Sequence, residues 1–146
     1  MTTENHVDPQ EAQFAAFKDL PRDRPINMLN LVRFKAEAEY PEGHELHGKD
    51  LTGAEAYTTY GQATGPIFAR VGGEIIWRGD FEGVVIGPSD ERWDAVFIAR
   101  YPDASCFMEM VTDPEYRKAV VHRQAAVQTS RLIRCGEPGS SGSGFG

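Results

Sequence analysis

Small and apolar residues recur at helical spacing near the start of the chain. The set follows Asp8 and Pro9, which suit a helix cap and a first turn, and it comprises Ala12, Ala15, Ala16 and Leu20. The prolines within residues 21–25 disfavour helix at the residues that precede them. The pattern therefore predicts an N-terminal helix that ends at about Leu20.

The next segments alternate between strand and helix patterns. Residues 26–34, INMLNLVRF, have the nearly continuous apolar character of a buried strand. Thr52 and Glu55 have the spacing of a capping box, which predicts a helix from about Ala54. Pro66 should kink this helix, and Gly72 or Gly73 can end it in the left-handed conformation.

The second half of the chain predicts three strands, two helices and a last strand. Residues 73–87 read as two short strands around GDFEG, with hairpin chemistry in the Gly79 and Asp80 pair, and residues 93–101 form another strand. Pro102 with Asp103 starts a short helix, and Asp113 with Pro114 starts a longer one. The segment VQTSRLIRC, residues 127–135, closes the fold as a strand.

Without the first helix and the extra hairpin strand, this order is the ferredoxin-like βαββαβ unit, an α+β fold whose antiparallel sheet has helices on one face. Apolar residues occupy both parities of the strands, so we expect the bare face to be covered by a second copy in a homodimer. We divide the chain into a helical extension (1–23), a core domain (24–136) with an inserted loop (35–53), and a flexible Gly/Ser tail (137–146).

Charge and composition argue against some classes of binding partner. The 146 residues contain 15 Lys and Arg against 22 Asp and Glu, a formal charge of −7 that disfavours nucleic acid. We find neither an apolar run of membrane-spanning length nor a signal peptide, so we expect a cytoplasmic protein with no membrane partner. Cys106 and Cys135 are far apart in the sequence, and we expect both to be buried, reduced thiols.

Several motifs of the C-terminal half resemble a known bacterial family, the domain of unknown function 1330, within the dimeric α+β barrel superfamily. The matching positions are Gly72, Gly73, Trp93, Tyr101, Pro102, Met110, the DPEY of residues 113–116, and Arg123. The N-terminal helix and the loop 35–53 are extra relative to short members. The resemblance implies the barrel fold and a dimer. Relatives in the superfamily include cofactor-free monooxygenases, isomerases, cyclase-like proteins and haem enzymes, so it does not select a reaction.

We select the candidate ligand-binding residues from the elements that should surround one cavity: Asn30, Tyr60, Trp77 and Arg100. Arg123 joins them because it lies on the apolar stripe of the helix that Pro114 starts. Two readings of Arg123 stay open, a structural ion pair, for instance with Asp113, or anion binding.

The histidines give weaker evidence for a functional site. His44, Glu45 and His47 are metal-ligand types, but their spacing in a glycine-flanked loop favours a solvated segment that can act as a lid, and we expect no metal site. His122 shares the charged face of its helix with Glu115 and Lys118, so we expect it to be solvated and dispensable for folding.

The functional hypothesis is a homodimer that needs no cofactor and binds a small aromatic or carboxylated molecule, with oxygenase-like or isomerase-like chemistry open to it. The alternative is a non-catalytic dimer, either a small-molecule-binding or a structural protein. We find no nucleophile elbow, phosphate loop or dinucleotide fingerprint. The sequence therefore leaves open whether the protein is an enzyme.

Overall fold

The computed structural model describes residues 5–137. Eight elements follow one another along the chain: α1 (Glu11–Asp19), β1 (Ile26–Phe34), α2 (Gly53–Arg70), β2 (Glu74–Gly79), β3 (Ala95–Tyr101), α3 (Ala104–Thr112), α4 (Pro114–Ala126) and β4 (Val127–Cys135). Apart from Glu137, the tail predicted for residues 137–146 lies outside the described residues.

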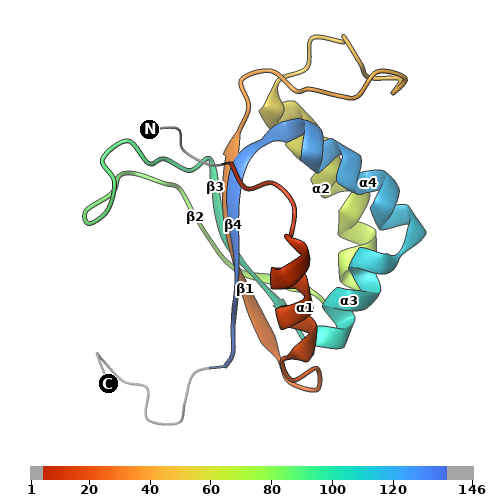
Figure 1. Ribbon diagram of the computed structural model, residues 1–146, viewed down its shortest axis with the longest axis vertical. Coiled ribbons are helices and arrows are strands. Elements are labelled where there is room, and N and C mark those ends of the chain that lie inside the picture. Colours follow the sequence, from red (N-terminus) through yellow and green to blue (C-terminus); the bar gives the residue numbers. More distant parts are fainter. Residues whose placement is uncertain (1–4, 138–146) are drawn as a thin grey trace.

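The strands form one four-stranded antiparallel sheet in the order β2-β3-β1-β4. Helices α2, α3 and α4 all cover the same side of it, and the opposite side is open (Figure 1). The predicted ferredoxin-like βαββαβ fold is confirmed, with α1 as an addition that packs near the free edge of β4. Phe17 of α1 contacts Phe107 of α3, with ring centroids 5.2 Å apart, and its carbonyl oxygen accepts a hydrogen bond from Arg134 of β4.

The central strand β1 divides its side chains between the two sides of the sheet. Ile26, Met28 and Val32 are at most 3% exposed and pack under the helices. Because side chains alternate along a strand, the odd-numbered residues from Asn27 to Arg33 face the open side. We call this side the open face.

Two apolar clusters fill the space between sheet and helices. The first, which we call the α3-side core, consists of Ile26, Met28, Ile67, Val71, Ala99, Tyr101, Ala104, Phe107 and Met110. The second, which we call the loop-side core, consists of Val32, Tyr40, Ala56, Ala125, Ala126 and Val127. The buried residues of the two clusters are distinct sets, and the partly buried Phe97 packs against both.

Helix caps follow the sequence signals in three of four cases. Thr52 and Glu55 make the reciprocal bonds of a capping box, and the carboxylates of Asp103 and Asp113 accept from backbone amides at the starts of α3 and α4. The prediction that Asp8 caps the first helix is wrong, because α1 begins at Glu11 and its N-cap residue Gln10 makes no side-chain cap bond.

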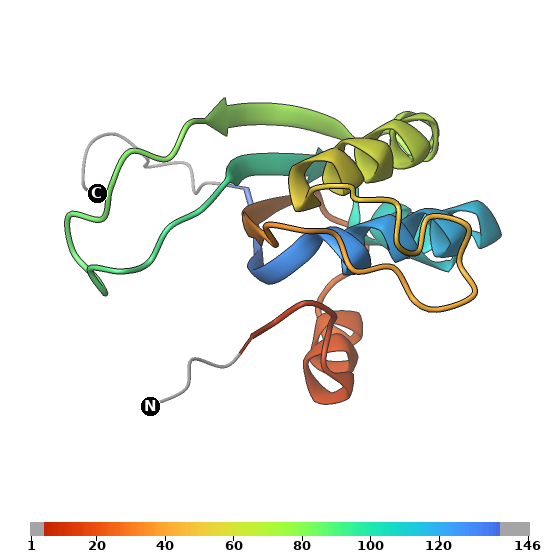
Figure 2. The ribbon, with the colours of Figure 1, turned by 90° about the horizontal axis from the view of Figure 1, so that it is seen from above.

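The second strand of the predicted hairpin does not form. Residues 80–94 are a loop that projects from the open-face side of the sheet (Figure 2), and Val85 and Ile86 are 96% and 95% exposed. β2 pairs with β3 instead. Gly87, at φ 144°, and the following Pro88 interrupt the segment, so it cannot extend the sheet.

The inserted loop 35–53 is docked on the fold. The amide of Ala38 bonds the carbonyl of Leu51, the amide of Glu39 bonds the carbonyl of Ala125, and Tyr40 is 5% exposed within the loop-side core. The two cysteines depart from expectation, since Cys106 is half-buried and Cys135 is exposed.

Two glycines of α2 should respond oppositely to alanine. A Cβ at Gly53 would clash with the carbonyl oxygen of Lys35 and lie 2.9 Å from that of Ala126, whereas a Cβ at Gly61 would meet open space. Gly53→Ala should lower the free energy of unfolding by more than about 2 kcal/mol, because backbone atoms cannot move aside. Gly61→Ala should raise it by up to ~1 kcal/mol through helix propensity. Urea denaturation measures both, and equal effects would contradict the placement of Gly53.

Candidate functional site

Polar side chains fill the interval between the two apolar clusters. On β1, Asn30 lies between Met28 of the α3-side core and Val32 of the loop-side core. On α2, Tyr60 and Thr64 lie between Ala56 and Ile67 in the same way, and Tyr116 reaches them from α4. With the adjacent Tyr57, we call this set the polar belt: Asn30, Tyr57, Tyr60, Thr64 and Tyr116.

The tyrosines of the belt contact one another. The hydroxyls of Tyr60 and Tyr116 are 3.0 Å apart and hydrogen-bonded, and the rings of Tyr57 and Tyr60 have centroids 5.5 Å apart. Burial raises the pKa of Tyr57 and of Tyr116 well above the ordinary value of a phenol. These two hydroxyls therefore stay protonated at neutral pH and act as hydrogen-bond donors rather than as bases.

Thr64 has a buried hydroxyl oxygen that lacks a hydrogen-bond partner within the described residues. Its side chain is buried, and its Oγ1 finds no hydrogen-bond partner among residues 5–137. A buried hydroxyl without a partner costs about 1–3 kcal/mol. Such groups in native proteins call for an explanation, and a ligand that supplies the partner is one.

Beneath the belt, one row of helix-facing residues crosses the sheet. Strand pairing aligns Arg78 with Phe97, Phe97 with Asn30, and Asn30 with Leu132. The guanidinium of Arg78 lies 5.5 Å from the centre of the Phe97 ring, and its positive charge acts to lower the pKa of Tyr57 against the larger effect of burial. No ion pair of Arg78 occurs within the described part of the chain. The row therefore adds an aromatic surface and a positive charge to the belt's donors.

The structure separates the residues chosen from the sequence. Asn30 and Tyr60 belong to the belt, and the amide nitrogen of Asn30 donates to the carbonyl of Met28 at 3.0 Å. Trp77 and Arg100 lie on the open face instead. One chain therefore does not bring the four residues together on one side of the sheet.

Arg123 has a structural environment. It donates to the carbonyl of Val7 and, at 3.1 Å, to the hydroxyl of Ser130, which ties the N-terminal segment to β4. The ion pair considered for it is made by another arginine, since Arg70 lies 2.6 Å from Asp113. Of the two readings left open, the structure favours the structural one, with backbone and hydroxyl acceptors in place of a carboxylate.

The open face carries an apolar row that spans all four strands. Trp77 pairs with Ile98, Ile98 with Leu29, and Leu29 with Ile133. Trp77 is 51% exposed and Ile133 is 45% exposed. A polar row of Glu74, Arg100, Asn27 and Cys135 borders it. The row on its other side, Gly79, Val96, Leu31 and Arg131, is mostly apolar, so the open face carries a continuous apolar surface of the kind found at protein interfaces.

His122 is half-buried and bonded, so the prediction that it is solvated is wrong. Its Nδ1 lies 2.7 Å from the hydroxyl of Tyr40, and the ring of His44 stacks on Tyr40 with centroids 4.7 Å apart. The backbone carbonyl of Tyr40 also contacts His47 Nδ1 at 2.8 Å. Tyr40 and His44 therefore contact His122 and connect the loop to α4, whereas His47 bonds within the loop.

Sequence reasoning did not assign Tyr57, Thr64, Tyr116 and Arg78 to a common site. Their association depends on strand register and on which face of α2 meets the sheet. The sequence does contain one sign of the belt. Polar residues replace the expected apolar ones on the buried faces, at Asn30 of β1 and at Tyr60 and Thr64 of α2.

Comparison with known families supports the resemblance seen in the motifs. The model of the family described as Domain of unknown function (DUF1330) matches residues 46–135. The chain belongs to the DUF1330 family. The matched segment runs from the end of the inserted loop to the end of β4, so it contains α2, α4 and most of the belt.

Solved structures show the same fold. The chain is 51% identical to RPA0582, a protein of unknown function from Rhodopseudomonas palustris, with a TM-score of 0.85 over 93% of this chain and 99% of that one. Methylated RPA0582 matches at 50% identity and a TM-score of 0.87, over 94% and 98% of the two chains. These matches establish the family's fold without a reaction.

A more distant match is to SnoaB, a cofactor-independent oxygenase from Streptomyces nogalater. It is 15% identical, with a TM-score of 0.50 over 80% of this chain and 96% of that one, and it shows the fold alone. No protein with a curated description matches the chain. Within the described residues of this DUF1330 protein, none of the helices has the length and apolar character to cross a membrane.

The contact between Tyr40 and His122 should make stability pH-dependent. Burial and the nearby His44 lower the pKa of His122, against a smaller opposing effect of Glu45. As the pH falls below about 6.5, the unfolded chain takes up this proton first, so the free energy of unfolding decreases. His122→Gln, which keeps an acceptor but does not titrate, should lose less stability than the wild type between pH 7.5 and 5.5. Urea unfolding at the two pH values measures this, and identical losses would contradict it.

Proposed function

We propose that this DUF1330 protein is a homodimer that binds a small aromatic carboxylate in the polar belt between sheet and helices. The observation that carries the proposal is the belt itself, a polar layer that interrupts an otherwise apolar core. Apolar residues of similar size would make that core more stable, because buried polar groups must recover their lost hydration. Hydrogen bonds from a ligand to these groups would explain why polar residues occur there.

The chemistry of the belt indicates the kind of ligand. Tyr57 and Tyr116 keep their hydroxyl protons, which a ligand's oxygens could accept, and Arg78 supplies a positive charge at the edge of the sheet. Carboxylate and phenolate oxygens accept both kinds of donor. The ring of Phe97, which already contacts Arg78, offers a surface for an aromatic body.

The belt favours binding over proton abstraction. Its ionisable side chains include Tyr57 and Tyr116, whose raised pKa leaves no phenolate to act as a base near neutral pH. The likeness to SnoaB, a cofactor-independent oxygenase, rests on 15% identity and does not supply a base. These contacts therefore support a binding protein, and Tyr57 and Tyr116 do not supply the base that oxygenase-like or isomerase-like chemistry would use.

Dimerisation follows from the open face. An antiparallel sheet can expose one face to water when that face is polar, but here an apolar row crosses it from Trp77 to Ile133. A second copy placed face to face about a two-fold axis buries the apolar row of each copy against the other. Arg100 and Trp77, the candidates that lie away from the belt, then belong to the dimer interface.

Thr64 provides a test in which stability and binding change in opposite directions. Thr64→Val removes the unpartnered hydroxyl and keeps the shape, so it should raise the free energy of unfolding by about 1 kcal/mol. The same change should weaken salicylate binding, measured by calorimetry, several-fold. Thr58→Val is the matched control on the exposed side of α2 and should leave salicylate affinity unchanged.

Arg78→Gln should weaken salicylate binding by about tenfold through loss of a charge-assisted bond, whereas Arg117→Gln, on the exposed surface of α4, should not. Absence of saturable salicylate binding, or equal affinity in both arginine variants, would contradict the proposal.

Two neighbouring residues of β4 test the dimer. Ile133 lies on the open face and Leu132 on the opposite side, and they are 45% and 43% exposed. Ile133→Glu should shift the mass in sedimentation velocity from twice 16.2 kDa to a single chain, whereas Leu132→Glu should leave the dimer intact. A wild-type protein that sediments as a single chain, or a dimer that survives Ile133→Glu, would contradict the proposal.

A further inference from the structure

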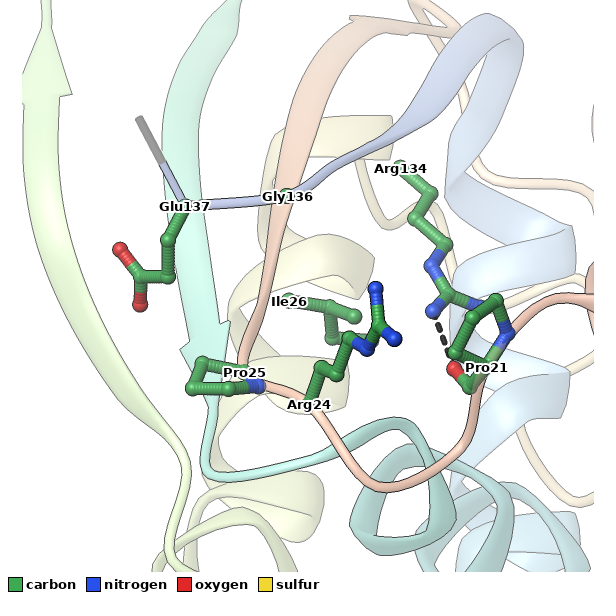
Figure 3. Close-up of a pocket in the computed structure, with 7 residues that line it drawn as sticks. All are labelled: Pro21, Arg24, Pro25, Ile26, Arg134, Gly136 and Glu137. Atoms are coloured by element: carbon green, nitrogen blue, oxygen red, sulfur yellow. Dashed lines mark hydrogen bonds between the residues drawn. The ribbon is translucent and has the colours of Figure 1, made fainter. Parts of the chain in front are cut away.

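A hollow away from the polar belt lies where the turn after α1, the start of β1 and the end of β4 meet. It has a volume of about 390 Å³ and is lined by Pro21, Arg24, Pro25, Ile26, Arg134, Gly136 and Glu137 (Figure 3). Residues from both ends of the described chain therefore form it together. Asn27 holds the end of β4 in place by donating from its amide nitrogen to the carbonyl of Gly136 at 3.2 Å.

Arg134 is fixed in this hollow by its neighbours. Its guanidinium donates to the carbonyl of Pro21 and, at 3.4 Å, to that of Phe17, and it lies 5.0 Å from the centre of the Phe17 ring. Neutral carbonyls orient the group and leave its charge uncompensated. Burial lowers the pKa of Arg134, in line with the partial loss of hydration.

Arg24 brings a second positive charge to the same place. Figure 3 shows its guanidinium turned toward that of Arg134. Its own ion pair is with Asp23, at 3.8 Å between side chains that are 73% and 88% exposed, and such pairs contribute little. An anion placed between the two guanidiniums pairs with both charges.

The carboxylate that also lines the hollow is engaged elsewhere. One oxygen of Glu137 accepts from Arg100 Nε at 2.9 Å and lies 2.8 Å from its Nη2. In Figure 3 this carboxylate points away from Arg24 and Arg134. Glu137 therefore does not neutralise the two arginines.

We propose that this hollow binds the carboxylate of a small organic acid, with the acid group between Arg24 and Arg134 and its apolar body against Pro21, Pro25 and Ile26. The two guanidiniums match the planar, two-oxygen geometry of a carboxylate. The prolines and Ile26 offer no donors from their side chains, so they favour a hydrocarbon body over a hydrated inorganic anion. This site is independent of the function proposed for the belt.

Calorimetry with hexanoate and the full-length protein tests the site, because hexanoate has a carboxylate and an apolar body but no aromatic ring. Arg24→Gln should weaken hexanoate binding by at least about tenfold. Arg22→Gln is the matched control: this exposed neighbour donates to the carbonyl of Lys18 and does not line the hollow, so hexanoate affinity should stay unchanged. Arg134→Gln should also abolish binding, but Arg24→Gln is the decisive variant because its side chain is exposed and its removal leaves the fold intact.

A further variant distinguishes hexanoate binding in this hollow from salicylate binding in the belt. Arg78→Gln should leave hexanoate binding unchanged, so a failure of salicylate binding would not affect this result. No saturable binding of hexanoate, equal affinity in the wild type and Arg24→Gln, or phosphate binding as tight as hexanoate binding would each overturn the proposal.

Discussion

The alternation of side chains along β1 is the constraint on which the rest of this protein depends. One set, from Ile26 to Val32, anchors three helices, and the other set, with Leu29 and Leu31, leaves an apolar row on the opposite side. Because the helices cover only one side (Figure 1), a single chain satisfies half of the sheet. In the proposed homodimer, a second copy would cover the other half.

The helix-covered side of the sheet is not uniformly apolar, and the ligand binding that we propose rests on its polar residues. The sheet and α2 each interrupt their apolar spacing at the same depth, with Asn30 below and Tyr60 and Thr64 above. Polar residues scattered at random through a core would each lower stability without a partner nearby. Here polar residues of two separate elements occur at the same depth. The proposed binding site rests on this coincidence of polar residues.

Much of the fold could be predicted from the sequence because its signals are local. The capping box of Thr52 and the cap of Asp113 fix helix starts, and the strand patterns fix the topology. The site could not be predicted, because a bulge between Ile75 and Trp77 sends those two residues to opposite faces, although their spacing suggests one face. His122 was misjudged for a related reason: its partner Tyr40 comes from a loop 82 residues away.

The central claim, that the open face is covered in solution, is tested most directly by hydroxyl-radical footprinting of the intact protein. Trp77 and Ile133 are about half exposed in one chain, and Val85 is 96% exposed on the nearby loop. The account predicts that Trp77 and Ile133 are oxidised far more slowly than these exposures imply, while Leu132, at 43%, is oxidised at its normal rate. Oxidation of Trp77 and Ile133 in proportion to their exposure would contradict it.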